Sequence, residues 1–204
     1  MKYFYFVVLI ALVVATLPLQ LGIALCILLT SGTPALFTQK RTGKDGKPFR
    51  LYKFRTMIAG AEKMQTKYQT MNEAHGPVFK IRDDPRFTPF GKFLSRTGLD
   101  ELPQLFNVLK GEMALIGPRP LPVSEARKLI VWQKERQKIL PGIISPWVLD
   151  GYHANSFVSW MKNDIAYSKQ KNIFTDIVLF FQTILFIRKL LMRELIRYIL
   201  PLKA

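Results

Sequence analysis

Two adjacent carboxylates, Asp100 and Glu101, stand at the head of an apolar stretch in a chain that is otherwise strongly basic. The sequence has 30 Lys and Arg residues against 14 Asp and Glu residues, which gives a formal net charge of +16. Acids in the first turn of a helix are common, because unpaired amides and the helix dipole stabilise them by about 0.3–1 kcal/mol. The pair alone therefore favours helix capping over chemistry, and the neighbouring residues must change that balance.

Basic side chains accompany the pair in the sequence. Arg96 lies four residues before Asp100, and Arg119 stands between Pro118 and Pro120, which stiffen its backbone. The helix dipole is expected to keep a carboxylate ionised, and therefore nucleophilic. A second carboxylate can bind a hard cation, and arginines fit phosphate oxygens in a bidentate way. Together these residue types favour phosphoryl transfer.

A second basic pair, Lys53 and Arg55, lies in the stretch Tyr-Lys-Phe-Arg-Thr-Met beside an aromatic residue. The two side chains either bind phosphate or are solvated strand residues. The sequence contains no Walker-type glycine loop, zinc-ligand spacing or histidine cluster. The histidines, His75 and His153, are isolated, and we predict that neither is catalytic. The single cysteine, Cys26, excludes an intrachain disulfide.

The N-terminal region has the composition of a membrane segment. Residues 3–39 carry no charge, and residues 3–29 are almost continuously apolar, which exceeds the apolar part of a signal peptide. Pro18 removes a helical hydrogen bond and predicts a kink. The helix halves before and after it, about 22 and about 18 Å long, are both shorter than the roughly 30 Å hydrocarbon layer. We expect a re-entrant helix over residues 1–32, with a kinked span as the alternative.

The charges beside this segment predict its orientation. Only Lys2 precedes it, and five basic residues follow it: Lys40, Arg41, Lys44, Lys47 and Arg50. Positive charge favours the cytoplasmic side, so the soluble part is expected there in either topology. Within the segment, Thr16 and Gln20 can satisfy backbone groups that the proline frees.

Hydrophobic periodicity and turn residues predict a small α+β fold that is mostly helical, with a short β-hairpin. We expect strands over 35–39 and 49–54 joined by a turn at 43–46, helices over 58–72, 99–110 and 123–140, a short turn or helix over 91–96, and a helical tail from about Phe174. The tail mixes phenylalanines with arginines and lysines, which is typical of an amphipathic helix at a membrane interface. The predicted domains are a membrane helix over 1–32, a catalytic domain over 33–172 and the interfacial tail over 173–204.

At this point the residues resemble a known family, the bacterial monotopic phosphoglycosyl transferases. These sugar transferases start exopolysaccharide, O-antigen and glycoconjugate assembly on a polyprenyl phosphate. The resemblance covers nearly the whole chain and rests on the apolar segment with its central proline and on the stretches 37–41, 52–57, 83–88, 99–110 and 116–120. The stretch 72–88 is more similar to the hexose-1-phosphate transferase branch than to the most compact members.

The resemblance implies a two-step reaction at the bacterial inner membrane, with the catalytic domain on the cytoplasmic face. Asp100 would attack the sugar-linked phosphorus of a UDP-sugar and release UMP, and polyprenyl phosphate (undecaprenyl phosphate) would then take the phosphosugar. Glu101 would act beside it and bind Mg²⁺, the family's cofactor, and Pro18 would break the membrane helix. The expected phosphate-binding residues are Lys53, Arg55, Arg96, Pro118, Arg119 and Pro120. A homo-oligomer is left open.

Some positions depart from the family pattern. Leu17 and Gly98 stand where serine is common, and Ser95 stands where many members have arginine. An arginine on the nucleotide side is absent, and Trp147 or Tyr152 could stack on a base instead. Asp164 and Tyr167 match an Asp-x-x-Tyr pattern whose role the sequence does not assign.

Two other classes of function compete with the enzyme. The altered region 144–152 suggests a membrane-anchored binding module with a decayed active site, working in a glycan-assembly complex. The net charge suggests a membrane-tethered nucleic-acid binder, but the sequence contains no nucleic-acid-binding motif, and phosphate binding accounts for the charge. We therefore expect no nucleic acid among the partners.

Overall fold

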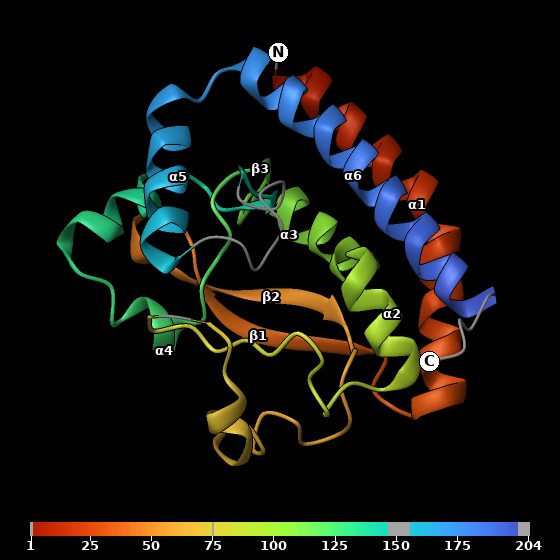
Figure 1. The fold of residues 1–204 in the computed structure, drawn as a ribbon. Helices are drawn as coiled ribbons and strands as arrows, with labels where there is room; N and C mark the ends of the chain where they lie inside the picture. Colours follow the sequence, from red (N-terminus) through yellow and green to blue (C-terminus); the bar gives the residue numbers. More distant parts are fainter. Residues whose placement is uncertain (1, 75, 147–155, 200–204) are drawn as a thin grey trace.

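The computed structural model describes residues 2–74, 76–146 and 156–199 (Figure 1). Trp147, Tyr152, His75 and His153 lie outside the described residues. The first element is a helix of 30 residues, α1 (Lys2–Ser31), which continues through Pro18 without a break. The two separate halves expected from the proline are therefore not seen. This helix is the one in the described part of the chain that is long and apolar enough to cross a membrane, by length and composition alone.

Polar side chains inside α1 bond within the helix. The Thr16 hydroxyl lies 2.8 Å from the Leu12 carbonyl and 3.1 Å from the Val13 carbonyl, and the Gln20 amide donates to the Thr16 hydroxyl. Pro18 withdraws the hydrogen bond that the Val14 carbonyl would accept. The Thr16 hydroxyl thus donates to the Leu12 and Val13 carbonyls rather than to the Val14 carbonyl that the proline leaves without its partner.

The predicted hairpin is confirmed. Strands β1 (Leu36–Thr42) and β2 (Pro48–Phe54) pair antiparallel, with Phe37 opposite Lys53. The connection is a short 3-10 helix, η1 (Lys44–Gly46), in which Asp45 and Gly46 both have positive φ. The fold is α+β, as expected, and a second, parallel strand pair joins β3 (Ala114–Ile116) to β4 (Gly142–Ile144).

The segment of the acid pair forms a bent helical unit. Helix α2 (Pro89–Thr97) ends at Gly98, whose φ of 75° lies in the left-handed region. The 3-10 helix η3 (Leu99–Gln104) then leads into α3 (Leu105–Leu109). Residues other than glycine rarely adopt this φ, so the glycine at position 98 favours the bend. The helix predicted over 99–110 is confirmed, with a 3-10 first half.

Two stretches that were predicted as continuous helices consist mostly of turns and 3-10 helix. Residues 59–65 form turns, followed by the 3-10 helix η2 (Thr66–Met71). The stretch 123–140 divides into α4 (Val123–Ala126) and the 3-10 helix η4 (Val131–Lys138). The polar residues of this stretch had predicted the solvated face of an α-helix. Two of them on η4, Gln133 and Arg136, are instead buried, and their side chains make hydrogen bonds with backbone groups. Helices α5 (Phe157–Gln170) and α6 (Ile173–Ile199) complete the chain, and the predicted helical tail is confirmed as a helix.

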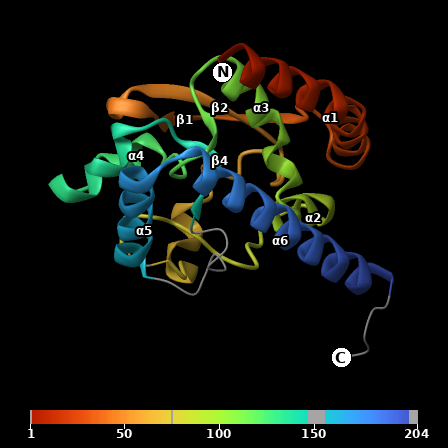
Figure 2. The same ribbon diagram turned by 90° about the horizontal axis from the view of Figure 1, so that it is seen from above.

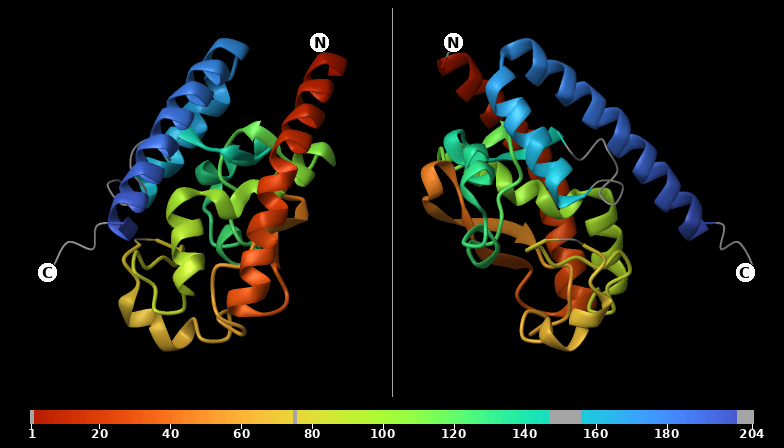
Figure 3. Two further views of the ribbon diagram at one scale, coloured as in Figure 1. Left: turned by 90° about the vertical axis from the view of Figure 1, so that its right-hand side faces the viewer. Right: turned by 60° about the vertical axis from the view of Figure 1, so that its left-hand side comes forward.

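Helices α1 and α6 flank the body of the molecule. The left view of Figure 3 shows them on opposite sides of α2, and Figure 2 shows the two helices apart from each other when seen from above. One face of α1 is buried against the hairpin and the bent unit through Leu9, Val13, Ile23 and Ile27. Their spacing forms one helical stripe that spans both sides of Pro18. The rest of α1 exposes large apolar side chains, including Val7, Val14, Leu21, Leu25 and Leu29.

Candidate active site

The acid pair meets both a lysine and an arginine. Nζ of Lys53, on β2, lies 3.2 Å from Oδ2 of Asp100 and 2.7 Å from Oε1 of Glu101. Nη2 of Arg119, which follows β3, lies 2.8 Å from the same Oε1. The side chains of Asp100 and Glu101 are only 7% and 13% exposed. The structure thus brings together four residues from separate parts of the sequence, at positions 53, 100, 101 and 119, all of them among the predicted site residues.

A buried asparagine fixes the strand that carries Lys53. Asn107, on α3, is fully buried, and its amide donates to the Arg50 carbonyl at 2.7 Å. Its carbonyl oxygen accepts from the Tyr52 amide at 3.1 Å. Because both bonds join α3 to β2 beside Lys53, they hold the lysine in register with the acid pair on η3.

The two carboxyl groups have different electrostatic surroundings. Burial raises the pKa of Glu101, but Arg119 and Lys53 outweigh it and lower that pKa to about 2. Burial also raises the pKa of Asp100; Lys53 opposes the rise and the Glu101 charge adds to it, and the net direction is upward. The dipole of a helix start was expected to keep Asp100 ionised, and desolvation outweighs it here. Glu101 is therefore the anchored anion, and Asp100 is the more basic carboxylate.

A wider cationic shell surrounds Arg119. Arg41, on β1, donates from Nη1 to the Pro120 carbonyl at 3.0 Å. Burial, reinforced by the Arg119 charge, lowers the pKa of Arg41 to about 10 and that of Lys80 to about 7. From the sequence, Arg41 was assigned only to a family stretch and to the basic residues that follow the membrane segment, and Lys80 was not predicted to have a role. The residues around Lys80, at 78–81, carry no local signal that would separate it from a solvated lysine.

The other two basic residues that were predicted to bind phosphate lie elsewhere, whereas Pro118 and Pro120 flank Arg119. Arg55 is buried and donates to the carbonyls of Ser31, Gly32 and Thr33, so it closes the C-terminal end of α1. Arg96 pairs with Asp83 at 2.5 Å and with Glu194, on α6, at 3.3 Å. The structure therefore gives both arginines contacts that tie elements together, and it joins neither to the acid pair. Proximity in sequence was the only basis for including Arg96.

The acid pair suits a magnesium ion whose remaining ligands are phosphate oxygens of a substrate and water. In the described part of the chain, no group of three His, Cys, Asp or Glu side chains could hold a metal. Mg²⁺ is usually bound through one or two carboxylates plus substrate phosphates and water, so a site of this kind needs no third acid. Both cations contact Oε1 of Glu101, which leaves Oε2 as the natural metal-binding oxygen. The low pKa of Glu101 keeps that oxygen charged.

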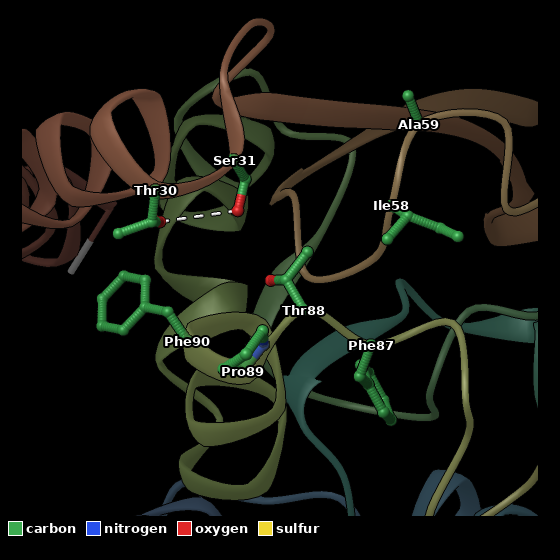
Figure 4. Close-up of a pocket in the computed structure, with 8 residues that line it drawn as sticks. All are labelled: Thr30, Ser31, Ile58, Ala59, Phe87, Thr88, Pro89 and Phe90. Carbon is green, nitrogen blue, oxygen red and sulfur yellow. Dashed lines mark hydrogen bonds between the residues drawn. The ribbon is translucent and has the colours of Figure 1, made fainter.

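A hollow of about 550 Å³ lies at the opposite end of α2 from the acid pair (Figure 4). Its lining is mostly apolar and comes from the end of α1, the loop after β2 and the start of α2: Thr30, Ser31, Ile58, Ala59, Phe87, Thr88, Pro89 and Phe90. Figure 4 shows the Thr30 and Ser31 hydroxyls side by side at its edge, 3.4 Å apart. None of the predicted site residues lines it.

These features define a class of protein: a small α+β domain packed on a long apolar helix, with a buried acid pair held by lysine and arginine. The chain belongs to the bacterial sugar transferase family, whose sequence profile matches residues 2–189.

Relatives with assigned names support this membership. The galactosyl transferase CpsE of Streptococcus agalactiae is 42% identical over 154 residues, covering 75% of this chain and 34% of that protein. An Aeromonas hydrophila protein named UDP-N-acetylgalactosamine-undecaprenyl-phosphate N-acetylgalactosaminephosphotransferase is 38% identical, covering 82% and 38%. An Escherichia coli protein named UDP-glucose:undecaprenyl-phosphate glucose-1-phosphate transferase is 35% identical, covering 82% and 35%. The chain thus spans little more than a third of the length of these relatives.

Proposed function

We propose that this protein transfers a sugar 1-phosphate from a UDP-sugar to polyprenyl phosphate and releases UMP. The observation that carries the proposal is the buried pair Asp100–Glu101, held between Lys53 and Arg119. Relatives named as undecaprenyl-phosphate sugar phosphotransferases support the same substrate classes. The reaction would be the first membrane step in the assembly of a bacterial surface glycan or glycoconjugate.

The reaction proceeds in two displacements at one phosphorus atom. A carboxylate oxygen of Asp100 attacks the sugar-linked phosphorus, the bond from that phosphorus to the bridging oxygen of UMP breaks, and UMP leaves. The phosphosugar is then esterified to Asp100. An oxygen of polyprenyl phosphate attacks the same phosphorus, the bond to Asp100 breaks, and the free carboxylate returns with the polyprenyl diphosphate sugar as product.

The surrounding residues lower the repulsion between reacting anions. Lys53 contacts both carboxylates and holds the Asp100 oxygen in place for attack. Arg119 is 23% exposed and can bind a phosphate oxygen while it pairs with Glu101. Bound Mg²⁺ would neutralise charge on the phosphates and the leaving group. Glu101, anionic at neutral pH, would hold that ion.

We further propose that the protein lies on the cytoplasmic face of the inner membrane, with α1 as a re-entrant helix and α6 along the interface. The exposed apolar side chains of α1 support a membrane helix, whereas re-entry rests on the family resemblance, since α1 continues through Pro18 without a break. On α6, exposed apolar residues accompany exposed basic ones, which suits an anionic lipid surface: Phe174, Phe181, Leu185, Arg188, Lys189 and Arg193. A water-soluble sugar nucleotide and a lipid phosphate would meet at that boundary.

Release of UMP from a panel of UDP-sugars, with magnesium and a polyprenyl phosphate, tests the proposal. The wild type should release UMP with at least one sugar, and Asp100→Asn should not. The exposed carboxylate Asp83 provides the matched control, because it lies outside the acid pair, and Asp83→Asn should retain turnover. Without the lipid acceptor, intact-protein mass spectrometry should detect one added phosphosugar on the wild type. A decayed binding module would bind the UDP-sugar but show neither UMP release nor the adduct.

A further inference from the structure

The segment that carries Arg119 is held through its carbonyl groups. Pro118 and Pro120 have no amide hydrogen, so the carbonyls are the backbone groups by which neighbours can fix this segment. Each of four consecutive carbonyls accepts a hydrogen bond from a different residue. The bonds are Gly142 N to Pro118 O at 3.0 Å, Arg136 Nη2 to Arg119 O at 2.6 Å, Arg41 Nη1 to Pro120 O at 3.0 Å and Thr42 N to Leu121 O at 2.9 Å.

Of these donors, Arg136 contacts the backbone of Arg119 itself. It lies on η4 and is only 3% exposed. Its Nε and Nη2 atoms lie 2.9 and 2.5 Å from Oδ2 of Asp164, on α5, which is fully buried. The guanidinium also lies over the Trp160 ring, 5.7 Å from its centre. A buried guanidinium needs a counter-ion, and Asp164 provides it.

The partner of Asp164 in the Asp-x-x-Tyr pattern lies against the start of the same segment. The Tyr167 hydroxyl is 3.3 Å from the Ile116 carbonyl and 2.5 Å from Oδ1 of Asp176. Three residues apart on a helix, positions 164 and 167 share a face. That face of α5 therefore contacts the segment directly at Ile116, through Tyr167, and indirectly at Arg119, through Arg136.

We propose that Asp164 is a positioning residue for the acid pair, acting through Arg136 and the backbone of Arg119. Asp164 holds the Arg136 guanidinium, Arg136 holds the Arg119 carbonyl, and the Arg119 side chain reaches Oε1 of Glu101 at 2.8 Å. Without the Asp164 charge, the buried Arg136 moves toward solvent and releases the carbonyl. The Arg119 guanidinium then no longer has a fixed distance from Glu101 or from a bound phosphate. The Asp-x-x-Tyr pattern thereby positions the Arg119 segment, although neither Asp164 nor Tyr167 contacts the acid pair.

Hydrogen exchange tests the physical link without any assay of activity. In Asp164→Asn, the amides in residues 114–122 should exchange about 10-fold faster than in the wild type, because the segment opens locally. Asp84→Asn is the matched control, since Asp84 and Arg86 form another buried pair, with contacts at 2.6 and 2.9 Å, that does not touch this segment. Equal protection of residues 114–122 in the two variants would overturn the proposal. If Asp164→Asn does not fold, Arg136→Lys carries the test, because it keeps the charge beside Asp164 but shortens the reach to the Arg119 carbonyl.

Catalytic coupling tests the role at the site, and this part rests on the proposed function. Asp164→Asn should lower kcat for UMP release by about 10- to 100-fold, the scale of a misplaced catalytic group. When Arg119→Ala is already present, adding Asp164→Asn should lower the residual rate less than about twofold. The control Asp84→Asn should have an equally small effect on the rate in the wild type and in the Arg119→Ala variant. An undiminished loss in the Arg119→Ala background would show that Asp164 supports the fold only. Failure of the wild type to release UMP would instead contradict the proposed function, and the exchange result would still decide the positioning.

Discussion

Nζ of Lys53 lies 3.2 Å from Oδ2 of Asp100, and this contact opposes the rise in the Asp100 pKa that burial causes. The same nitrogen lies closer to Glu101, at 2.7 Å. Lys53 is therefore shared unequally between the two carboxylates. Glu101 also has Arg119, so the charge on Glu101 is better compensated than the charge on Asp100.

The rate should fall on the acid side as Asp100 becomes protonated. Only the carboxylate form can attack phosphorus, and the pKa of Asp100 is raised above 3.8, so activity is lost as pH falls through that raised value. Lys53→Met removes the charge that lowers this pKa and should move the acid limb of kcat/KM to higher pH. Glu101→Gln removes a charge that raises it and should move the limb to lower pH.

UMP release by the two variants is measured across pH. The pH at which each acid limb falls can be determined even where the maximal rate of the variant is low. Asp83→Asn, an exposed carboxylate outside the pair, should leave the limb in place. Movement of both limbs in the same direction would show that another group sets the acid limb.

The Mg²⁺ requirement should depend on Glu101. Glu101→Gln removes the permanently charged ligand, so the Mg²⁺ concentration for half-maximal rate should rise by about 10-fold or more. Glu125→Gln is the control, because Glu125 accepts from the Phe79 amide outside the pair and its requirement should stay unchanged. A titration of UMP release against Mg²⁺ after chelation measures both. An unchanged requirement in Glu101→Gln would place the metal elsewhere.

Arg55 should matter for stability rather than for phosphate binding. Its guanidinium donates to the carbonyls of Ser31, Gly32 and Thr33, and the side chain is buried. Arg55→Ala should lower the free energy of unfolding by about 2–4 kcal/mol, since hydrogen bonds to a charged group contribute about 1.5–3 kcal/mol each and are not additive. Thermal unfolding in detergent measures this. The KM of Arg55→Ala for the UDP-sugar should change less than about threefold. A higher KM with an unchanged free energy of unfolding would show instead that Arg55 binds phosphate.

The sequence predicted the hairpin and the helix of the acid pair, and it named Arg119 and, through the family resemblance, Lys53 as phosphate-binding residues. Local signals carried these predictions: alternation in 49–54, glycines at turns and an apolar run after Asp100. It missed the 3-10 character of residues 66–71 and 131–138. In residues 131–138, the same polar periodicity fits both a solvated α-helix and a segment whose polar side chains bond inward. Gln133 and Arg136 are buried there, which only tertiary contacts determine.

The destinations of the arginines could not be predicted from the sequence for a related reason. A guanidinium can reach a phosphate, a carboxylate or a run of carbonyls, and its residue type is the same in each case. Arg55 closes a helix end, Arg96 joins α2 to α6, and only Arg119 reaches the acid pair. The prolines beside Arg119 were the one local feature that distinguished it.

Arg96 should be needed for the attachment of α6 and little for chemistry. It pairs with Glu194, which is 6% exposed, and with Asp83. Arg96→Ala should expose residues 183–196 to faster hydrogen exchange, while kcat/KM for UMP release falls less than about threefold. Arg119→Ala should show the reverse, a fall of about 100-fold or more with α6 unchanged. Similar losses of activity in both variants would return Arg96 to the phosphate-binding residues.

Binding of the UDP-sugar should take up protons above neutral pH through Lys80. Burial and the nearby Arg119 charge lower the pKa of Lys80 to about 7, so at pH 8 most of the lysine is neutral. A diphosphate bound at Arg119 brings negative charge close to Lys80 and raises its pKa, so the lysine takes a proton from solution. Below pH 6 the lysine is already charged and uptake of protons should vanish.

Calorimetric titration of Asp100→Asn, which binds the UDP-sugar without turnover, measures the proton uptake from the difference between two buffers of unlike ionisation enthalpy. Lys80→Met in the same background should abolish it, whereas Lys92→Met, at an exposed ion pair with Asp83, should leave it intact. Uptake that persists without Lys80 would assign the proton to another group.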